Sequence, residues 1–185
     1  MKKVFAKFIL KIFGWKIKGS LPDEKKYVLA VAPHTSALDM IMGKLHNWAE
    51  GLKPHIIVKK EFFYFPVKYF LKAWGAVPID RSKPQNLVEQ IAEEFDKNEE
   101  FVLVITPEGT RKANPHWKTG FYRIAVKAQV PIYMIYGDFK KKEIGFLGRF
   151  DPTGDMEKDI REIKEHFRSI NAYRPERFVL DADKH

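Results

Sequence analysis

The sequence lacks three features, and each absence excludes a class of protein or site. None of its 185 residues is cysteine, which excludes disulfide bonds and thiolate metal sites and permits a reducing compartment. It has no run of about 18 uncharged apolar residues, so we expect no membrane-spanning helix. It also has no Gly-rich phosphate-binding loop of the Walker or dinucleotide pattern, which argues against nucleotide hydrolysis and hydride transfer.

What is present is the composition of one globular domain, with 45% hydrophobic and 31% charged residues. Short apolar runs typical of buried strands alternate with segments whose apolar residues recur at helical spacing. The runs cover residues 27–31, 55–58, 75–79, 101–105 and 131–136, and the helical segments cover 36–48, 87–95, 121–128 and 156–170. This alternation predicts an α/β fold in which helices flank a central, mostly parallel sheet.

Positive charge is concentrated at the N-terminus. The net charge is +9, and residues 1–18 contain six lysines and no acidic residue. On a helical wheel Lys3, Lys7, Lys11 and Lys18 fall within about 80° of one another, and apolar side chains occupy much of the rest. We therefore predict a basic amphipathic helix over 1–18, ahead of a single α/β domain over 19–185. It is suited to a membrane surface with anionic lipid, or else it packs on the domain.

The first chemical feature is a histidine and an aspartate at a strand-to-helix junction. His34 follows the strand at 27–31, and a helix begins near Ser36, which suits the cap position. In the loop before the helix, His34 can fold back toward Asp39, which would orient the ring and make it a stronger base. Ser36-x-x-Asp39 also resembles a capping box, so capping is the alternative role of the carboxylate.

The second feature is the loop at 106–112, which follows the apolar strand 101–105. Gly109 lets the backbone approach a ligand, while Thr110 and Arg111 supply a hydroxyl and a guanidinium suited to a phosphate. Glu108 either holds that guanidinium or orients a substrate hydroxyl. Arg81 lies at the end of another predicted strand and Lys118 opens the next helix, so both can assist. An ordinary polar turn is the alternative interpretation.

Two other sets of residues carry less specific signals. The possible metal ligands are His34, Asp39, His46, His55 and Glu108. Their spacings match no common ligand pattern, so we predict no metal site. Residues 62–74 form an unusually aromatic segment. Such density is typical of a core, although the segment can also wall an acyl groove or meet lipid.

Four blocks of residues together carry a family resemblance. In order they are His34-x-x-x-x-Asp39, Gly75-Ala76-Val77-Pro78-Ile79-Asp80-Arg81, Pro107-Glu108-Gly109-Thr110-Arg111 and Val130-Pro131-Ile132. Over residues 27–137 they resemble the motif blocks of the glycerolipid acyltransferases, and most of all the bacterial 1-acylglycerol-3-phosphate acyltransferases. Pro33 departs from that pattern, because the family usually has asparagine before the histidine.

The resemblance implies an enzyme of phospholipid synthesis that moves a fatty acyl group from a thioester to a hydroxyl. The donor is acyl-CoA or acyl carrier protein, and the acceptor is 1-acylglycerol-3-phosphate or another lysolipid. His34 would be the base, oriented by Asp39. The acceptor would be bound by Arg81, Glu108, Gly109, Thr110, Arg111 and Lys118. No cofactor is implied, and the expected location is peripheral, on the cytoplasmic face of the membrane.

Two other classes of function fit parts of the sequence. A non-enzymatic membrane-lipid-binding module would use the basic helix and the aromatic segment alone. Nucleic-acid binding is suggested by a pI near 9.5, but six of the nine net charges lie in residues 1–18 and no nucleic-acid-binding motif is present, so we predict no such partner. Lys140-Lys141-Lys142 either meets an acidic carrier protein or is a solvated run of charge.

Overall fold

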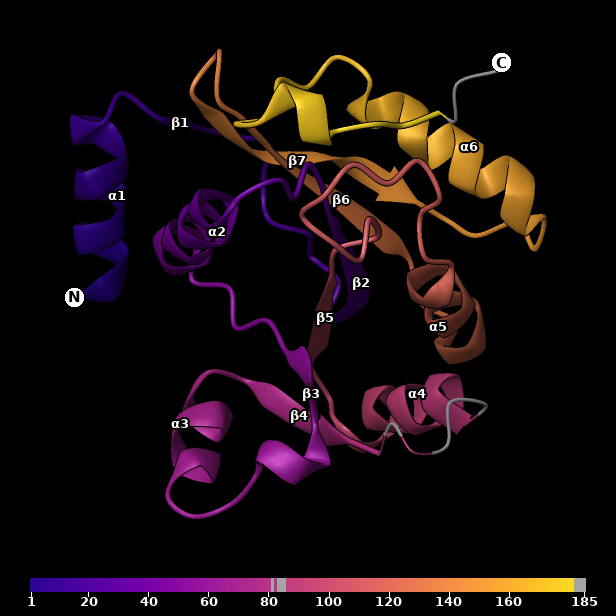
Figure 1. Ribbon diagram of the computed structural model, residues 1–185. Helices are drawn as coiled ribbons and strands as arrows, with labels where there is room; N and C mark the ends of the chain where they lie inside the picture. Colours follow the sequence, from indigo (N-terminus) through magenta and orange to yellow (C-terminus); the bar gives the residue numbers. More distant parts are fainter. Residues whose placement is uncertain (81, 83–85, 182–185) are drawn as a thin grey trace.

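The computed structural model describes residues 1–80, 82 and 86–181, and its centre is a five-stranded sheet (Figure 1). The strand order is β1-β7-β6-β2-β5, and every neighbouring pair is parallel except β6 with β7. The strands are β1 (Lys16–Lys18), β2 (Lys26–Val31), β5 (Phe101–Ile105), β6 (Ile132–Asp138) and β7 (Glu143–Phe150). The predicted α/β fold with a mostly parallel sheet is confirmed.

Helices cover both faces of this sheet. The α-helices of the described residues are α1 (Lys2–Ile12), α2 (Ala37–Glu50), α3 (Val67–Ala73), α4 (Leu87–Lys97), α5 (Gly120–Ala128) and α6 (Met156–Phe167). Of these, α1 packs on α2, and α3 packs on strand β4 (Ala76–Ile79) of a smaller sheet. On one face Val28 of β2 is buried in the cluster that holds Phe95 of α4 and Phe121 of α5. On the other face α2 places its buried His46 ring 5.7 Å from the ring of Phe146 in β7. Burial on both faces explains why β2 is an unbroken apolar run.

A smaller parallel sheet of two strands extends from this body. It consists of β3 (Ile56–Lys59) and β4 (Ala76–Ile79), and between them the chain forms the 3-10 turn η1 (Lys60–Phe62) and helix α3. His55 bridges this lobe to β5, because its N–H donates to the Val102 carbonyl at 2.7 Å and its carbonyl accepts from Val104 at 2.9 Å.

The N-terminal helix is shorter than the predicted span of 1–18. It ends at Ile12, because Gly14 adopts a φ of +74° and the N–H of Trp15 donates back to the Leu10 carbonyl at 2.8 Å. Lys16–Lys18 then forms the edge strand β1, paired with β7. The helical wheel therefore included residues that belong to the sheet.

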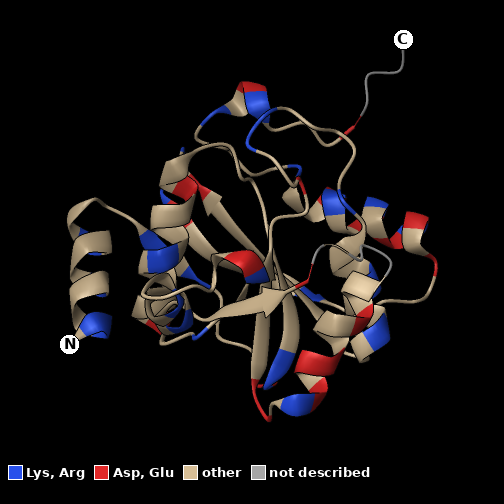
Figure 2. Cartoon of the chain, turned by 60° about the horizontal axis from the view of Figure 1, so that its bottom comes forward, with Lys and Arg blue, Asp and Glu red and all other residues tan. Residues whose placement is uncertain are grey.

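Helix α1 packs on α2 by a narrow face. Its buried residues, Ala6 and Leu10, pack with Ala49, whereas five apolar side chains of the helix and its C-cap are exposed by 54–74%: Val4, Phe5, Phe8, Ile12 and the C-cap Phe13. Figure 2 shows charged residues mainly on the helices and near strand ends. Among the described residues, no helix combines the length and hydrophobicity that crossing a membrane requires.

Candidate active site

The loops that follow β2 and β5 leave the same edge of the sheet. The two strands are parallel and adjacent, with Ala30 opposite Ile105, so their carboxyl ends coincide. His34 lies in the first loop and Glu108 to Arg111 in the second, as the sequence predicted. Arg81, expected at this edge too, lies outside the described residues.

Helix α2 begins as predicted, and its cap uses the Asp39 carboxylate. Ser36 is the N-cap, its hydroxyl accepts from the Leu38 N–H at 3.1 Å, and Ser36 and Asp39 form a capping box. Oδ2 of Asp39 accepts the N–H groups of Thr35 at 2.5 Å and Ser36 at 2.7 Å. Within the described part of the chain, no hydrogen bond joins this carboxylate to the ring of His34. Asp39 thus orders the loop backbone immediately before the helix.

The electrostatic environment keeps the His34 ring neutral at pH 7. Burial lowers the pKa of His34 most, the charge of Asp39 opposes this, and the positive charge of Arg111 lowers the pKa further. Asp39 and Arg111 are therefore the two charged residues that act on the ring. A neutral imidazole can accept a proton, which is what a general base requires.

Glu108 holds the His34 loop directly. Its side chain is buried, with 1% exposure, and its Oε1 accepts the backbone N–H of His34 at 2.6 Å. Burial raises the pKa of Glu108 to about 7, although the hydrogen bond from His34 lowers it, and the charge of Asp39 raises it. Its Oε2 has no partner among the described residues.

Of the two roles predicted for Glu108, the pairing with Arg111 is absent among the described residues. Glu108 points into the protein toward the backbone of His34, whereas Arg111, three residues later, is exposed. The two side chains diverge because the turn at Gly109 separates a buried position from a solvent-facing one. Arg111 is therefore left open to a ligand.

The turn itself is compact. Gly109 has a φ of +67°, and a Cβ there would lie 2.9 Å from Cγ of Lys118, so Lys118 packs across the glycine. The N–H of Lys118 donates to the Pro107 carbonyl at 2.7 Å, and Thr110 Oγ1 accepts from the N–H of Lys112 at 3.2 Å. The exposed Lys118 is thus brought beside Gly109 to Arg111.

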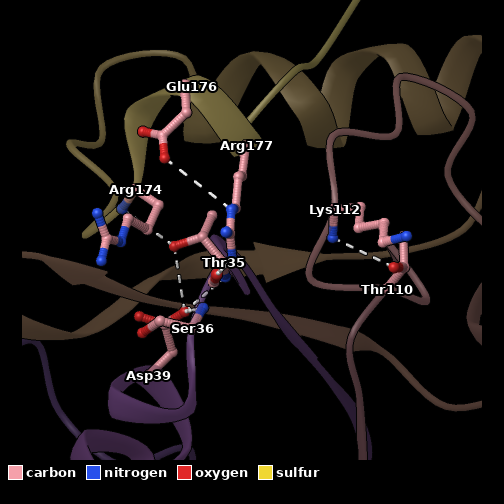
Figure 3. Close-up of polar contacts among 8 residues, drawn as sticks. All are labelled: Thr35, Ser36, Asp39, Thr110, Lys112, Arg174, Glu176 and Arg177. Carbon is pink, nitrogen blue, oxygen red and sulfur yellow. Dashed lines mark hydrogen bonds and ion pairs between the residues drawn. The ribbon is translucent and has the colours of Figure 1, made fainter.

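The C-terminal segment reaches the same loop, which the sequence gave no reason to expect. The N–H of Arg174 donates to Thr35 Oγ1 at 3.2 Å, and Arg177 Nη1 donates to the Thr35 carbonyl at 3.4 Å (Figure 3). Thr35 is fully buried, and its hydroxyl donates in turn to Asp39 Oδ2 at 3.3 Å. The segment around η3 (Pro175–Arg177) thereby brings the Arg177 guanidinium to the residue that follows the candidate base, whereas Arg174 contacts the loop through its backbone.

The possible metal ligands do not gather in the structure. Within the described residues, no three His, Asp or Glu side chains are grouped so as to hold a metal ion. His46 instead lies in the core between α2 and β7, where burial lowers its pKa to about 4.

Comparisons with known proteins point in one direction. A family model described as Acyltransferase matches residues 16–136, more than half of the chain. The fold is similar to the crystal structure of the 1-acyl-sn-glycerophosphate (LPA) acyltransferase PlsC from Thermotoga maritima, with a TM-score of 0.58 and 20% identity, covering 89% of this chain and 74% of that one. At that identity the similarity concerns the fold. No match was found among the curated proteins.

Proposed function

The chain belongs to the acyltransferase family, and on this premise we propose that it acylates a glycerolipid hydroxyl with a fatty acid from a thioester. The donor is acyl-CoA or acyl carrier protein, and the acceptor is 1-acylglycerol-3-phosphate. One observation carries the proposal: the hydrogen bond of 2.6 Å from the His34 N–H to Glu108. It holds the backbone of His34, whose ring is neutral, against the loop that presents Arg111.

In the proposed reaction His34 acts as the general base. Its neutral ring takes the proton from the acceptor hydroxyl while the oxygen attacks the thioester carbonyl carbon. The tetrahedral intermediate collapses, the C–S bond breaks, and the proton passes from the imidazolium to the leaving thiolate. The products are an ester and a free thiol, and His34 is neutral again without an acyl-enzyme.

The acceptor is assigned from the groups beside His34. Arg111 and Lys118 are exposed cations next to a turn whose glycine leaves the backbone accessible, an arrangement that suits a phosphate. The similar fold of an enzyme named for 1-acyl-sn-glycerophosphate supports the same acceptor. Another lysolipid with an anionic head group fits the same cations and is the alternative acceptor.

We also propose that the enzyme works at a membrane surface, because its substrates are lipids. Helix α1 carries lysines beside exposed apolar side chains such as Phe5 and Phe8. An interfacial helix of this kind would bind anionic lipid and hold the site near its acceptor.

A thiol-release assay tests the reaction. The full chain is incubated with acyl-CoA or acyl carrier protein and a panel of lysolipids, and the lipid product is identified by mass. We expect thiol release that depends on 1-acylglycerol-3-phosphate and falls about 10² to 10⁴-fold in His34→Ala. Equal turnover by folded His34→Ala would contradict the mechanism. Vesicle binding without thiol release from either donor would instead indicate a non-enzymatic lipid-binding module.

A further inference from the structure

The lobe formed by β3, η1, α3 and β4 exposes an unusual amount of aromatic surface. No residue of η1 or α3 is buried. Six large aromatic side chains there are exposed by 53–75%: Phe62, Tyr64, Phe65, Tyr69, Phe70 and Trp74. We call these six residues the aromatic lobe surface. Soluble monomers rarely expose contiguous apolar patches of large size, so this one indicates a binding partner. The sequence-based expectation that the segment forms core is wrong.

The charges around this surface indicate the kind of partner. Residues 59–74 contain four lysines and one glutamate. Lys68 Nζ lies 5.2 Å from the Tyr69 ring centre, and Lys44 Nζ of α2 lies 5.3 Å from that of Trp74. This combination is typical of a surface that binds a membrane interface. Phenylalanine can enter the acyl boundary, tryptophan and tyrosine lie at the depth of the head groups, and lysine binds anionic head groups.

The position of the lobe agrees with this assignment. Figure 1 shows α1, α2 and α3 on one side of the molecule and α4, α5 and α6 on the other. Lysines over tryptophan rings connect the three helices. Lys2 of α1 lies 5.8 Å from the ring centre of Trp48 in α2. Lys44 of α2 lies 5.7 Å from the same ring and 5.3 Å from that of Trp74, the C-cap of α3. At the start of α2, beside Asp39, Met40 and Ile41 are exposed as well.

We propose that the aromatic lobe surface is a second membrane-binding surface, separate from α1, which docks on a bilayer that contains anionic lipid. Docking at both points would set the start of α2, and with it the candidate site, against the lipid. A second copy of the chain fits less well, because it would bring two lysine-rich surfaces together. This inference concerns binding and does not depend on turnover.

Trp74 provides a direct test, since it is 61% exposed and Trp117 is 5% exposed. The full chain is mixed with vesicles of phosphatidylcholine and phosphatidylglycerol whose acyl chains carry bromine, which quenches nearby tryptophan. We expect quenching that Trp74→Phe clearly reduces and Trp117→Phe leaves in place; the remainder comes from the half-buried Trp15 and Trp48 beside α1. Quenching that is unchanged in Trp74→Phe would overturn the proposal.

Charged substitutions provide an independent test. Phe65→Asp with Phe70→Asp should weaken sedimentation with unbrominated vesicles of the same lipids about tenfold, because both side chains leave the acyl boundary. The control Tyr173→Asp alters an exposed aromatic residue in the C-terminal segment and should bind as the wild type does. Circular dichroism and thermal unfolding establish that the variants are folded. His34→Ala should bind vesicles fully, which separates this test from that of acyl transfer.

Three results would overturn the proposal. The first is unchanged vesicle binding by the Phe65→Asp/Phe70→Asp double variant, while a Phe5→Asp/Phe8→Asp double variant in α1 loses binding. The second is a wild-type dimer in lipid-free solution that the lobe variant converts to a monomer, which would assign the surface to a second copy. The third is a lobe variant that binds vesicles normally but has a raised KM for short-chain acyl-CoA in the absence of vesicles. That result would assign the lobe to binding the acyl chain of the substrate.

Discussion

The buried carboxyl group of Glu108 accepts the backbone N–H of His34 at 2.6 Å and makes no ion pair with Arg111 among the described residues. Glu108 thus acts on the residue that carries the candidate base, and not on the cation in its own loop. Its role is to position His34, because the contact is to the main chain and leaves the imidazole free to meet a substrate.

Substitution of Glu108 should separate its hydrogen bond from its charge. Glu108→Ala leaves the His34 N–H without its acceptor, so we expect a loss of about 1–3 kcal/mol in the free energy of unfolding and a lower kcat. Glu108→Gln keeps a carbonyl oxygen in the same place and should retain most of both. Denaturant unfolding and thiol release measure the two effects. An alanine variant as stable and active as the glutamine variant would contradict the positioning role.

The raised pKa of Glu108 also predicts how stability depends on pH. Its folded-state value of about 7 exceeds the ordinary value of 4.5, so the folded protein holds this proton more tightly than the unfolded chain. The resulting stabilisation is complete below pH 4.5 and is lost as the pH rises toward 7, by up to about 3 kcal/mol. Glu108→Gln cannot titrate. The difference in unfolding free energy between variant and wild type should therefore change across this range, and a constant difference would refute the assignment.

The pH dependence of catalysis should report the two charges near His34. A base works when neutral, so kcat/KM should rise with pH through the His34 pKa, which burial holds below 6.5, and then level off. Arg111→Ala removes a cation that lowers this pKa, so the midpoint should move to higher pH while the acceptor KM rises. Arg111→Lys keeps the charge and should keep the midpoint. A midpoint that stays in place in Arg111→Ala would show that the guanidinium does not act on the ring.

Thr35 connects the C-terminal segment to the His34 loop, and its hydroxyl can be tested alone. Thr35→Val leaves the Arg174 N–H without an acceptor in a partly buried setting, which should cost about 1 kcal/mol of unfolding free energy. Thr35→Ser retains the hydroxyl and should lose less. Urea unfolding of the two variants makes the comparison. Equal stability of the valine and serine variants would show that the contact with Arg174 contributes nothing.

Local signals in the sequence were sufficient for much of the fold. The apolar run before His34 predicts β2, because a strand buried on both faces is apolar at every position. Ser36 predicts the start of α2, because an N-cap is recognised from the residues next to it. The same logic placed Glu108 and His34 at one sheet edge, since parallel strands align their carboxyl ends. The orientation of Glu108 was missed, because a side chain's choice between Arg111 and the His34 backbone is decided by packing 74 positions away along the chain.

Other elements had no such local signal. Strand β7 contains Gly145 and Gly148, which interrupt any apolar alternation, yet a Cβ at Gly145 would collide with the Lys18 backbone of β1. Gly145 allows β1 and β7 to approach each other closely, and this approach is visible only in the folded structure. Arg174 and Arg177 likewise follow no periodicity, and their relation to Thr35 is purely tertiary.

The turn at Gly109 offers a final test, because two separable effects oppose a side chain there. Its φ of +67° favours glycine, so alanine should cost about 1–2 kcal/mol through backbone strain alone. The new Cβ would also press on Lys118 at 2.9 Å from its Cγ and push it away from Arg111. In a Lys118→Ala background the strain remains but the crowding is gone, so Gly109→Ala should cost less there than in the wild type. A double-mutant cycle by denaturant unfolding measures this coupling. Equal costs in the two backgrounds would mean that Lys118 moves aside freely and that Gly109 serves the backbone alone.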